Sequence, residues 1–287
     1  EEMNLVTISG HHVNTIEHML NHYKDKVNDI FIGVHRNSLS DEDYERLVQI
    51  TNDIGCGIYK EYNFPLYHWT KVTDIYNEIK SLKPNDWWII SDDDEFHQYQ
   101  NPLNDIIDNC EDNNWKFVTG AFLDRISIDG SLKKVEQGID ISKQFPLGGM
   151  FRFLVSKACP NKVVIAKGDV QVSSGQHYAI IDGKEVRTRD NSEIASGIDH
   201  PQRCDYLWEF TQVHHYKWDE SLKKRLEQIV GIDEKYTYGW EYGLLIDYLN
   251  YHGGLIDIND KNFKFQNMNE FPNHESWDYI RDVSLRF

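Results

Sequence analysis

Four consecutive acidic residues, Asp92, Asp93, Asp94 and Glu95, follow the tryptophan-led hydrophobic run at residues 87–91. Neighbouring negative charges repel one another, so such a cluster needs a compensating cation. Carboxylate oxygens are the preferred ligands of hard divalent cations. If the chain is extended here, residues two apart point to the same side, and Asp92 and Asp94 share one partner. The pattern therefore predicts a Mg²⁺ or Mn²⁺ site, with a solvated acidic turn as the plainer alternative.

Histidines follow two later segments of the chain. His177 lies in the segment at residues 173–178, just beyond an expected strand, and His214 and His215 follow the strand expected at residues 209–213. An imidazole can be a third protein ligand of Mn²⁺ or a hydrogen-bond donor to a phosphate oxygen. The alternative for each of them is a surface position or a hydrogen-bonded place in the core.

Asp124 and Arg125 end the strand expected at residues 117–123, at the same edge of the predicted sheet as the acidic cluster. Asp124 is predicted to act as a general base or to orient one, and Arg125 to hold a diphosphate. An ordinary ion pair is the alternative. Asp129, in an Asp-Gly turn signal, and Asp169 are weaker candidates for the base.

The loop after the first expected strand is a candidate for nucleotide binding. Ser9, Gly10 and Asn14 lie in this loop, between a strand and a helix. Loops in this position meet ligands at the edge of α/β sheets. The chain contains neither a G-x-G-x-x-G fingerprint, nor a Walker A loop, nor a G-x-S-x-G nucleophile elbow. Dinucleotide binding of the Rossmann type, P-loop chemistry and hydrolysis at a serine elbow are therefore not indicated.

Alternating strands and helices must position these side chains. Ser40 is placed to cap a helix with Asp43 at its third position, and Gly55 is placed to end that helix. Strand, helix and strand in alternation predict a parallel sheet with crossover helices. The segments that carry this pattern are strands near residues 5–9, 30–34, 57–59 and 87–91, with helices in the three intervals. After residue 98 the alternation ends, and after residue 218 the pattern is mainly helical.

Composition limits the class of protein. The 30 basic and 47 acidic residues give a net charge of −17, which argues against binding to nucleic acid. The four cysteines are far apart, which argues against a disulfide framework or a zinc knuckle. No apolar run is long enough for a transmembrane segment, and the first residues lack the basic stretch of a signal peptide. We therefore expect a cytoplasmic protein.

Together these segments resemble the GT-A glycosyltransferases, particularly the family-2-like and family-92-like group. The resemblance rests first on Ile-Ile-Ser-Asp-Asp-Asp-Glu-Phe at residues 89–96, which looks like the D-x-D-E-F signature of that group. It rests further on the order of the later segments: Gly120, Asp124-Arg125, Asp129-Gly130, residues 162–165, 175–177 and 214–218. The Asn-Glu pair usual in the N-terminal loop of the family is absent, and residues 10–14 stand in its place.

The resemblance implies an α/β fold with a GT-A-like mixed sheet flanked by helices. It implies a glycosyltransferase domain at residues 3–218, with a nucleotide-binding half at 3–98, an acceptor half at 99–218, and a helical C-terminal extension at 219–287. The activity implied is transfer of a sugar from a UDP- or GDP-sugar donor to a hydroxyl of a carbohydrate or glycoconjugate acceptor. Two alternatives stay open: a nucleotidyltransferase or sugar-nucleotide pyrophosphorylase, and a non-catalytic carbohydrate- or Ca²⁺-binding module.

The resemblance also assigns roles to residues. Asp92 and Asp94 would bind Mn²⁺ or Mg²⁺, and a histidine would complete the metal shell, with His177 as first choice and His215 as second. Asp124 would be the leading candidate for the base of an inverting reaction. The donor and its metal would be contacted by further residues of the cluster and the loops, namely Ser9, Gly10, Asn14, Asp92, Asp93, Arg125 and His215.

Overall fold

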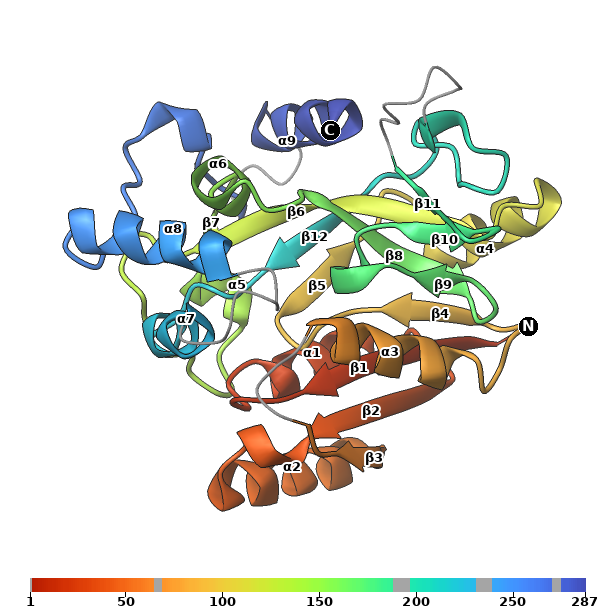
Figure 1. Ribbon diagram of the computed structural model, residues 1–287, viewed down its shortest axis with the longest axis horizontal. Helices are drawn as coiled ribbons and strands as arrows, with labels where there is room; N and C mark the ends of the chain where they lie inside the picture. The colour runs from red at the N-terminus through yellow and green to blue at the C-terminus, as the bar shows by residue number, and fades with distance from the viewer. Residues whose placement is uncertain (1, 65–68, 188–196, 231–238, 270–274) are drawn as a thin grey trace.

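The computed structural model describes residues 2–64, 69–187, 197–230, 239–269 and 275–287 (Figure 1). The α-helices are α1 (Ile16–Tyr23), α2 (Asp41–Ile54), α3 (Trp69–Lys80), α4 (Leu103–Asp112), α5 (Ile141–Gln144), α6 (Arg152–Ser156), α7 (Leu222–Val230), α8 (Gly239–Tyr251) and α9 (Glu275–Arg286). The strands are β1 (Met3–Ser9), β2 (Asp29–His35), β3 (Gly57–Tyr62), β4 (Trp87–Ile90), β5 (Glu95–Gln98), β6 (Phe117–Ile126), β7 (Leu147–Gly149), β8 (Asn161–Lys167), β9 (Gln171–Val172), β10 (Ala179–Ile181), β11 (Lys184–Val186), β12 (Thr211–His215) and β13 (Gln266–Asn267).

The N-terminal half is the predicted parallel sheet. Strands β3, β2, β1 and β4 lie side by side in that order, and every neighbouring pair is parallel. The Ser40 side chain accepts a hydrogen bond from the backbone N–H of Asp43 at the start of α2. Gly55 ends α2 with a φ of 84°, a left-handed conformation that glycine adopts without steric cost. Both local predictions are confirmed.

The second half of the sheet is mixed. Strand β8 is antiparallel to β4 and to β6, β7 is antiparallel to β6, and β12 is parallel to β6 and antiparallel to β5. Within the described residues these strands, the strands of the N-terminal half and β13 form one ten-stranded sheet. The predicted α/β class, with a mixed sheet flanked by helices, is confirmed.

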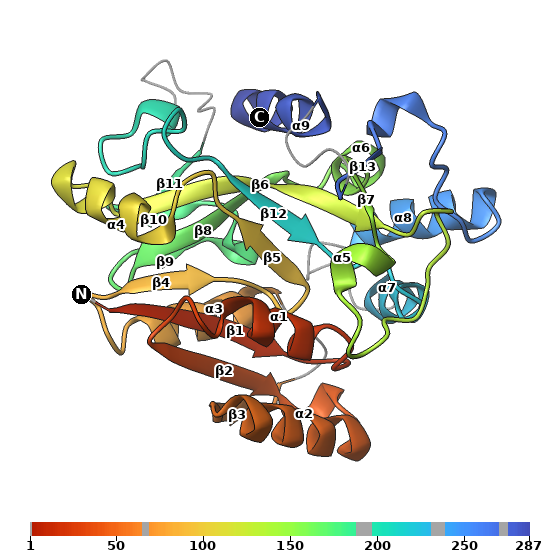
Figure 2. The same ribbon diagram turned by 180° about the vertical axis from the view of Figure 1, so that it is seen from behind.

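Alternating side chains of β4 explain why helices cover both faces of the sheet. Trp87 and Ile89 pack in a core cluster with α1, α2 and α4, whereas Trp88 and Ile90 pack in a second cluster with α3. Helix α3 lies on the face seen in Figure 1 and α1 on the face seen in Figure 2. A strand buried on both faces reads as a continuous hydrophobic run, which is the pattern of this segment.

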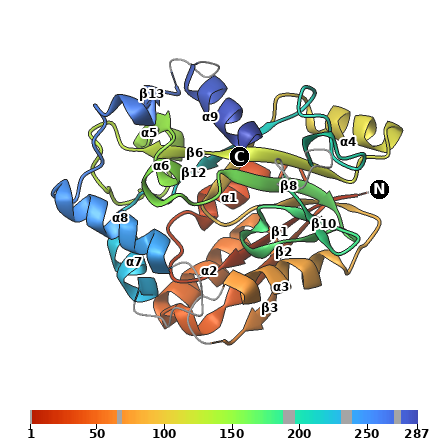
Figure 3. The same cartoon turned by 45° about the horizontal axis from the view of Figure 1, so that its top comes forward.

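The C-terminal part is largely helical, as predicted. Helices α7 and α8 lie side by side and share a hydrophobic cluster with Phe151 and Trp218 (Figure 3). Strand β13 pairs with β7, and α9 packs against β6, so this part also contributes to the main sheet and its cover. The boundaries at residues 98 and 218 stay predictions.

Candidate functional site

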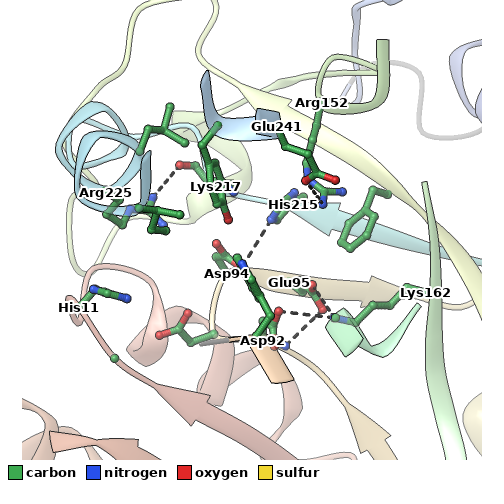
Figure 4. A pocket seen from close by; sticks show the side chains of 18 of the residues that line it. His11, Asp92, Asp94, Glu95, Arg152, Lys162, His215, Lys217, Arg225 and Glu241 are labelled. Carbon is green, nitrogen blue, oxygen red and sulfur yellow. Dashed lines mark hydrogen bonds and ion pairs between the residues drawn. The ribbon is translucent and has the colours of Figure 1, made fainter. Parts of the chain in front are cut away.

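A narrow pocket lies at the carboxyl ends of β1, β4 and β12. Its volume is about 90 Å³, and its polar lining comes from the acidic cluster, from β8 and β12, and from α6, α7 and α8 (Figure 4). Ligands of open α/β sheets bind at this end of the strands. The residues that line it include Gly10, Asp92, Asp93, Asp94, Glu95, Arg152, Lys162, His177, His215, Lys217, Arg225 and Glu241.

The acidic cluster forms a turn rather than an extended tip. Strand β4 ends at Ile90, and the backbone N–H of Glu95 donates to the carbonyl of Asp92 at 3.0 Å before β5 begins. Side chains of a turn do not alternate as they do in a strand. The extended conformation expected for this segment is therefore wrong, and the nearest partners of Asp92 and Asp94 differ.

Asp92 and Glu95 share the buried ammonium group of Lys162 on β8. Lys162 Nζ lies 2.9 Å from Oε1 of Glu95 and 3.5 Å from Oδ2 of Asp92, and Tyr76 donates its hydroxyl hydrogen to Asp92 at 2.5 Å. Burial disfavours the charged ammonium, but the charges of Asp92 and Glu95 outweigh this and raise the pKa of Lys162. One cation thus compensates part of the charge of the cluster.

Asp94 faces a histidine that is backed by a second carboxylate. His215 Nε2 lies 3.7 Å from Oδ1 of Asp94, and His215 Nδ1 lies 3.5 Å from Oδ1 of Asp124. Asp124 is 2% exposed and also accepts from Trp218 Nε1 at 3.1 Å and from two backbone N–H groups at 2.8 Å, those of Phe151 and Arg152. His215 thus lies between the acidic turn and a buried carboxylate, as metal-binding histidines do, but its Nδ1 makes no hydrogen bond to Asp124 in this structure.

The contacts of Asp124 also affect its chemistry. Burial alone would raise its pKa, but His215 and the backbone N–H groups of Arg152 and Phe151 lower it. Asp124 is absent from the lining of the pocket. The structure therefore favours a positioning role behind His215 over the predicted role of a base that contacts the acceptor.

Asp94, Glu95 and His215 form a group with the composition of a metal site. One ligand atom from each of these three residues lies within 4.8 Å of the other two. Among the described residues, this is the one group of histidine, cysteine or acidic side chains close enough together to hold a metal ion. Burial and the neighbouring charges of Asp94 and Asp92 raise the pKa of Asp93 well above its usual range. Four acidic side chains thus stand beside the one ammonium group of Lys162. A divalent cation fits this imbalance of charge.

Two residues of the predicted metal set lie nearby but outside this group. Asp92 lines the pocket and is engaged by Tyr76 and Lys162. His177 lines the pocket too, with its Nδ1 2.8 Å from the carbonyl oxygen of Asn161. Burial lowers the pKa of His177 to about 3, so its ring is neutral. The structure thus brings the second-choice histidine, His215, closer to the acids of the metal group than the first choice.

Basic side chains form the wall of the pocket opposite the acids (Figure 4). Arg225 donates to the carbonyl of Lys217 at 2.9 Å, and a nitrogen of Arg152 lies 3.9 Å from Oε2 of Glu241. Burial, reinforced by the charges of Arg152 and Arg225, lowers the pKa of Lys217 to about 7. The pocket therefore has an acidic floor and a basic wall, which suits a metal-bound anion.

The predicted N-terminal loop contributes one of its three residues to the lining. Gly10 lines the pocket together with His11 and His12. Ser9 is fully buried at the end of β1, and Asn14 donates to Oδ2 of Asp219 at 3.4 Å. The loop is therefore at the site, but Ser9 and Asn14 lie behind its surface.

Two predicted base candidates lie away from the pocket. Asp129 is in a turn, accepts from the backbone N–H of Ser131 at 3.1 Å and lies 3.5 Å from Lys133. Asp169 follows β8 and lies 3.4 Å from Lys116. Because β8 is antiparallel to β4, its end lies at the start of β4, remote from the acidic turn. Neither residue is in a position to act at the pocket as it stands.

Arg125 lies on the opposite face of the sheet from the acids. Asp124 pairs with His215 in the register of β6 and β12, and their side chains meet on the pocket side. Their neighbours Arg125 and His214 meet on the other side, with 2.9 Å between Arg125 Nη1 and His214 Nδ1. Successive side chains of a strand point to opposite faces, so one strand cannot present both Asp124 and Arg125 to one pocket.

Five further residues of the pocket were not predicted. Lys162 had a detectable signal, because a lysine within a buried apolar strand needs a partner for its charge. Arg152, Arg225 and Glu241 had none, since they come from α6, α7 and α8, which only tertiary packing brings to the acids. Lys217 lies two residues after His215, a candidate from the sequence.

No protein-family model and no curated protein sequence matches the chain. Similar solved structures include mannose-6-phosphate isomerase from Helicobacter pylori, at 13% identity over 59% of this chain and 72% of that one, with a TM-score of 0.31. They also include residues 1–349 of S. aureus TarS, at 9% identity over 99% and 79% of the chains, with a TM-score of 0.33. A third is UTP-bound UGPase from Acinetobacter baumannii, at 10% identity over 86% and 99%, with a TM-score of 0.31. At these TM-scores the likenesses carry no argument about function.

Every helix in the described ranges is too short or too polar to cross a lipid bilayer.

Proposed function

We propose that this chain is a metal-dependent glycosyltransferase that moves a sugar from a nucleoside-diphosphate donor to an acceptor hydroxyl. The observation that carries the proposal is the arrangement of Asp94, His215 and Asp124 beside the acidic turn, at the ligand-binding end of a parallel sheet. The resemblance of residues 89–96 to the D-x-D-E-F signature supports the same activity.

Asp94 and His215, with Glu95 beside them, would hold Mn²⁺ or Mg²⁺. The bound ion would act as a Lewis acid that stabilises the negative charge of the departing nucleoside diphosphate. Asp124 orients His215 for this task. Asp92 and His177 stay predicted ligands in the same pocket.

The basic wall would hold the diphosphate from the other side. Lys217 and Arg225 face the acidic turn, so an anion between wall and metal would contact positive charge on both sides (Figure 4). The pocket accommodates an ion and a few waters between the wall and the acidic turn. We expect side chains of the wall to move when the larger donor binds.

Glu241 is the carboxylate that we propose as the base for the acceptor hydroxyl. It lines the pocket from α8, opposite the acidic turn. Burial raises its pKa, which brings a carboxylate closer to the range in which it accepts a proton at neutral pH. Asp124, the candidate from the sequence, has both its oxygens occupied by other donors.

Thermal unfolding with ligands tests the proposal. The protein is heated with UDP or GDP, each with MnCl₂, with MgCl₂ or with EDTA. Binding at about 100 times Kd adds about 2.7 kcal/mol, so we expect Tm to rise by roughly 4–5 °C when one nucleotide and a metal are both present. The nucleotide that stabilises the protein then selects the sugar nucleotides for a transfer assay.

Two results would contradict the proposal. Stabilisation by CaCl₂ alone, indifferent to nucleotide, would indicate the binding module. Release of pyrophosphate from a nucleoside triphosphate and a sugar phosphate would indicate a nucleotidyltransferase.

A further inference from the structure

A second and larger cavity opens on the other face of the sheet. Its volume is about 760 Å³, and it lies between α1, α5, β5, the end of β6 and β12, on the side seen in Figure 2. The lining residues that carry the inference are His22, Lys26, Phe96, Arg125, His214 and Tyr216. This is the cavity onto which strand alternation directs Arg125 and His214.

The guanidinium of Arg125 is buried here, its hydrogen-bond partners are neutral groups, and Asp140 is the carboxylate whose charge acts on it. Arg125 is 3% exposed and donates through Nε to the carbonyl of Phe145 at 3.0 Å and through Nη2 to the carbonyl of Ser142 at 3.2 Å. Its Nη1 lies 2.9 Å from Nδ1 of His214. Among the described residues no carboxylate lies within 4.0 Å of it. A buried charge is costly without a counter-ion, and three hydrogen bonds leave two of the five N–H donors of an arginine for a ligand.

The lining of the cavity is poor in acids, although the chain as a whole is rich in them. Lys26 adds a second positive charge at the cavity, and Asp140 is the one carboxylate among the described lining residues. Asp140 Oδ1 is already engaged by the backbone N–H and the hydroxyl of Ser142, at 2.9 and 2.8 Å. In a chain with 47 acidic residues, this local balance favours an anionic ligand.

Aromatic rings next to Arg125 also contribute to the wall. The rings of Phe96 and Tyr216 meet at 73° with 4.9 Å between their centroids, and the Arg125 guanidinium lies 5.3 Å from the Tyr216 ring. His22 adds an imidazole next to Phe96. A charged group beside aromatic rings and imidazoles suits a ligand that joins an anionic group to a ring with hydroxyl groups.

We propose that this cavity binds a phosphorylated sugar, with the phosphate on Arg125 and Lys26 and the sugar ring against Phe96 and Tyr216. The site is distinct from the pocket of the acidic turn, because the sheet of β5, β12 and β6 lies between them. The ligand cannot reach Asp94 or His215, so the site is not the acceptor subsite of the proposed transferase. The proposal does not depend on that activity.

Calorimetric titration of the whole chain in EDTA tests the site with three probes: glucose 1-phosphate, inorganic phosphate and glucose. We expect saturable binding of glucose 1-phosphate, weaker binding of inorganic phosphate and none of glucose. Arg125→Gln should weaken glucose 1-phosphate binding about 10-fold or more, and Lys26→Gln roughly 3-fold. Lys24→Gln is the matched control, because Lys24 is also exposed after α1 but does not line the cavity.

Each result of these titrations either supports or contradicts the proposed site. If Arg125→Gln and Lys26→Gln both bind glucose 1-phosphate with unchanged affinity, the proposed site is wrong. If Arg125→Gln does not fold, the affinities of Lys26→Gln and Lys24→Gln for glucose 1-phosphate are compared instead, and equal values contradict the site. Glucose binding as tightly as glucose 1-phosphate overturns the role of the phosphate. Inorganic phosphate binding as tightly as glucose 1-phosphate overturns the role of the sugar ring.

Discussion

Asp94 is the residue whose charge matters most at the acidic turn, because it faces His215 and has no lysine partner among the described residues. Asp94→Asn should abolish the rise in Tm caused by metal with nucleotide. It should leave Tm without ligands within about 2 °C, because it removes a repelling charge and no core volume.

Asp74→Asn is the control for this prediction, since Asp74 is exposed on α3 and lies outside the pocket. Asp74→Asn should respond to ligands like the unaltered chain. A full metal-dependent shift in Asp94→Asn would show that Asp94 is not a ligand.

Asp124 can be tested as a positioning residue. Asp124→Asn removes the negative charge behind His215 and should weaken Mn²⁺ binding about 10- to 100-fold, measured by titration followed by electron paramagnetic resonance. A base would behave differently, because its loss lowers kcat and leaves metal affinity unchanged. Unaltered Mn²⁺ affinity with strongly reduced turnover would therefore restore Asp124 as the base.

Lys80 links stability to pH away from the site. It is fully buried on α3, its Nζ donates to the carbonyl of Val170, and burial lowers its pKa to about 8. Between pH 8 and 10.5 the unfolded chain carries this proton and the folded chain does not, so stability rises with pH in that window. Over this window the free energy of unfolding rises by about 3 kcal/mol in total.

Lys80→Met should lack this gain. Its free energy of unfolding, measured in urea, should therefore fall relative to the unaltered chain as the pH rises from 7 to 10. Lys71→Met, at an exposed position of the same helix, is the control and should show no such trend. A constant difference between Lys80→Met and the unaltered chain would mean that Lys80 stays charged in the fold.

Among the elements, the contact of β6 with β12 holds Asp124 and His215 together, and a glycine makes it possible. A Cβ at Gly120 would lie 2.1 Å from the carbonyl oxygen of Thr211, its partner on β12. Gly120→Ala should separate the strands, destabilise the protein by about 1–3 kcal/mol and weaken Mn²⁺ binding.

Gly243→Ala is the opposite case and serves as the control. Gly243 lies inside α8, and a Cβ there would meet nothing within 4 Å. Because alanine is the better helix former, this change should stabilise the protein by about 0.5–1 kcal/mol in urea denaturation. If Gly120→Ala and Gly243→Ala changed the free energy of unfolding equally, the close β6–β12 contact would not be what holds Asp124 and His215 together.

For the molecule as a whole, we expect side chains of the pocket wall to move when the donor binds. Trp69 lines the pocket on the side of α3. Addition of the stabilising nucleotide with Mn²⁺ should therefore change tryptophan emission, and Trp69→Phe should remove most of the change while nucleotide binding persists. A spectrum unaffected by saturating nucleotide would indicate a pocket that does not open.

Local patterns in the sequence predicted much of the fold. The cap at Ser40, the end of α2 at Gly55 and the parallel strands up to β4 depend on neighbouring residues and on hydrophobic periodicity. Strand β5 and helix α4 were not predicted. The four residues of β5 are too short a segment for periodicity to identify, and pairing with β12, more than 100 residues later, makes them a strand.

The acidic cluster, its place after a buried strand and its need for a cation follow from the sequence alone, because charge and strand periodicity are local properties. Which partners those acids have was decided by tertiary structure. Lys162 reaches Glu95, and His215 reaches Asp94, only because β8 and β12 join the sheet beside the acidic turn. Strand alternation, fixed by the register of β6 and β12, then places Asp124 on one face of the sheet, behind His215, and Arg125 on the other face, at the second cavity.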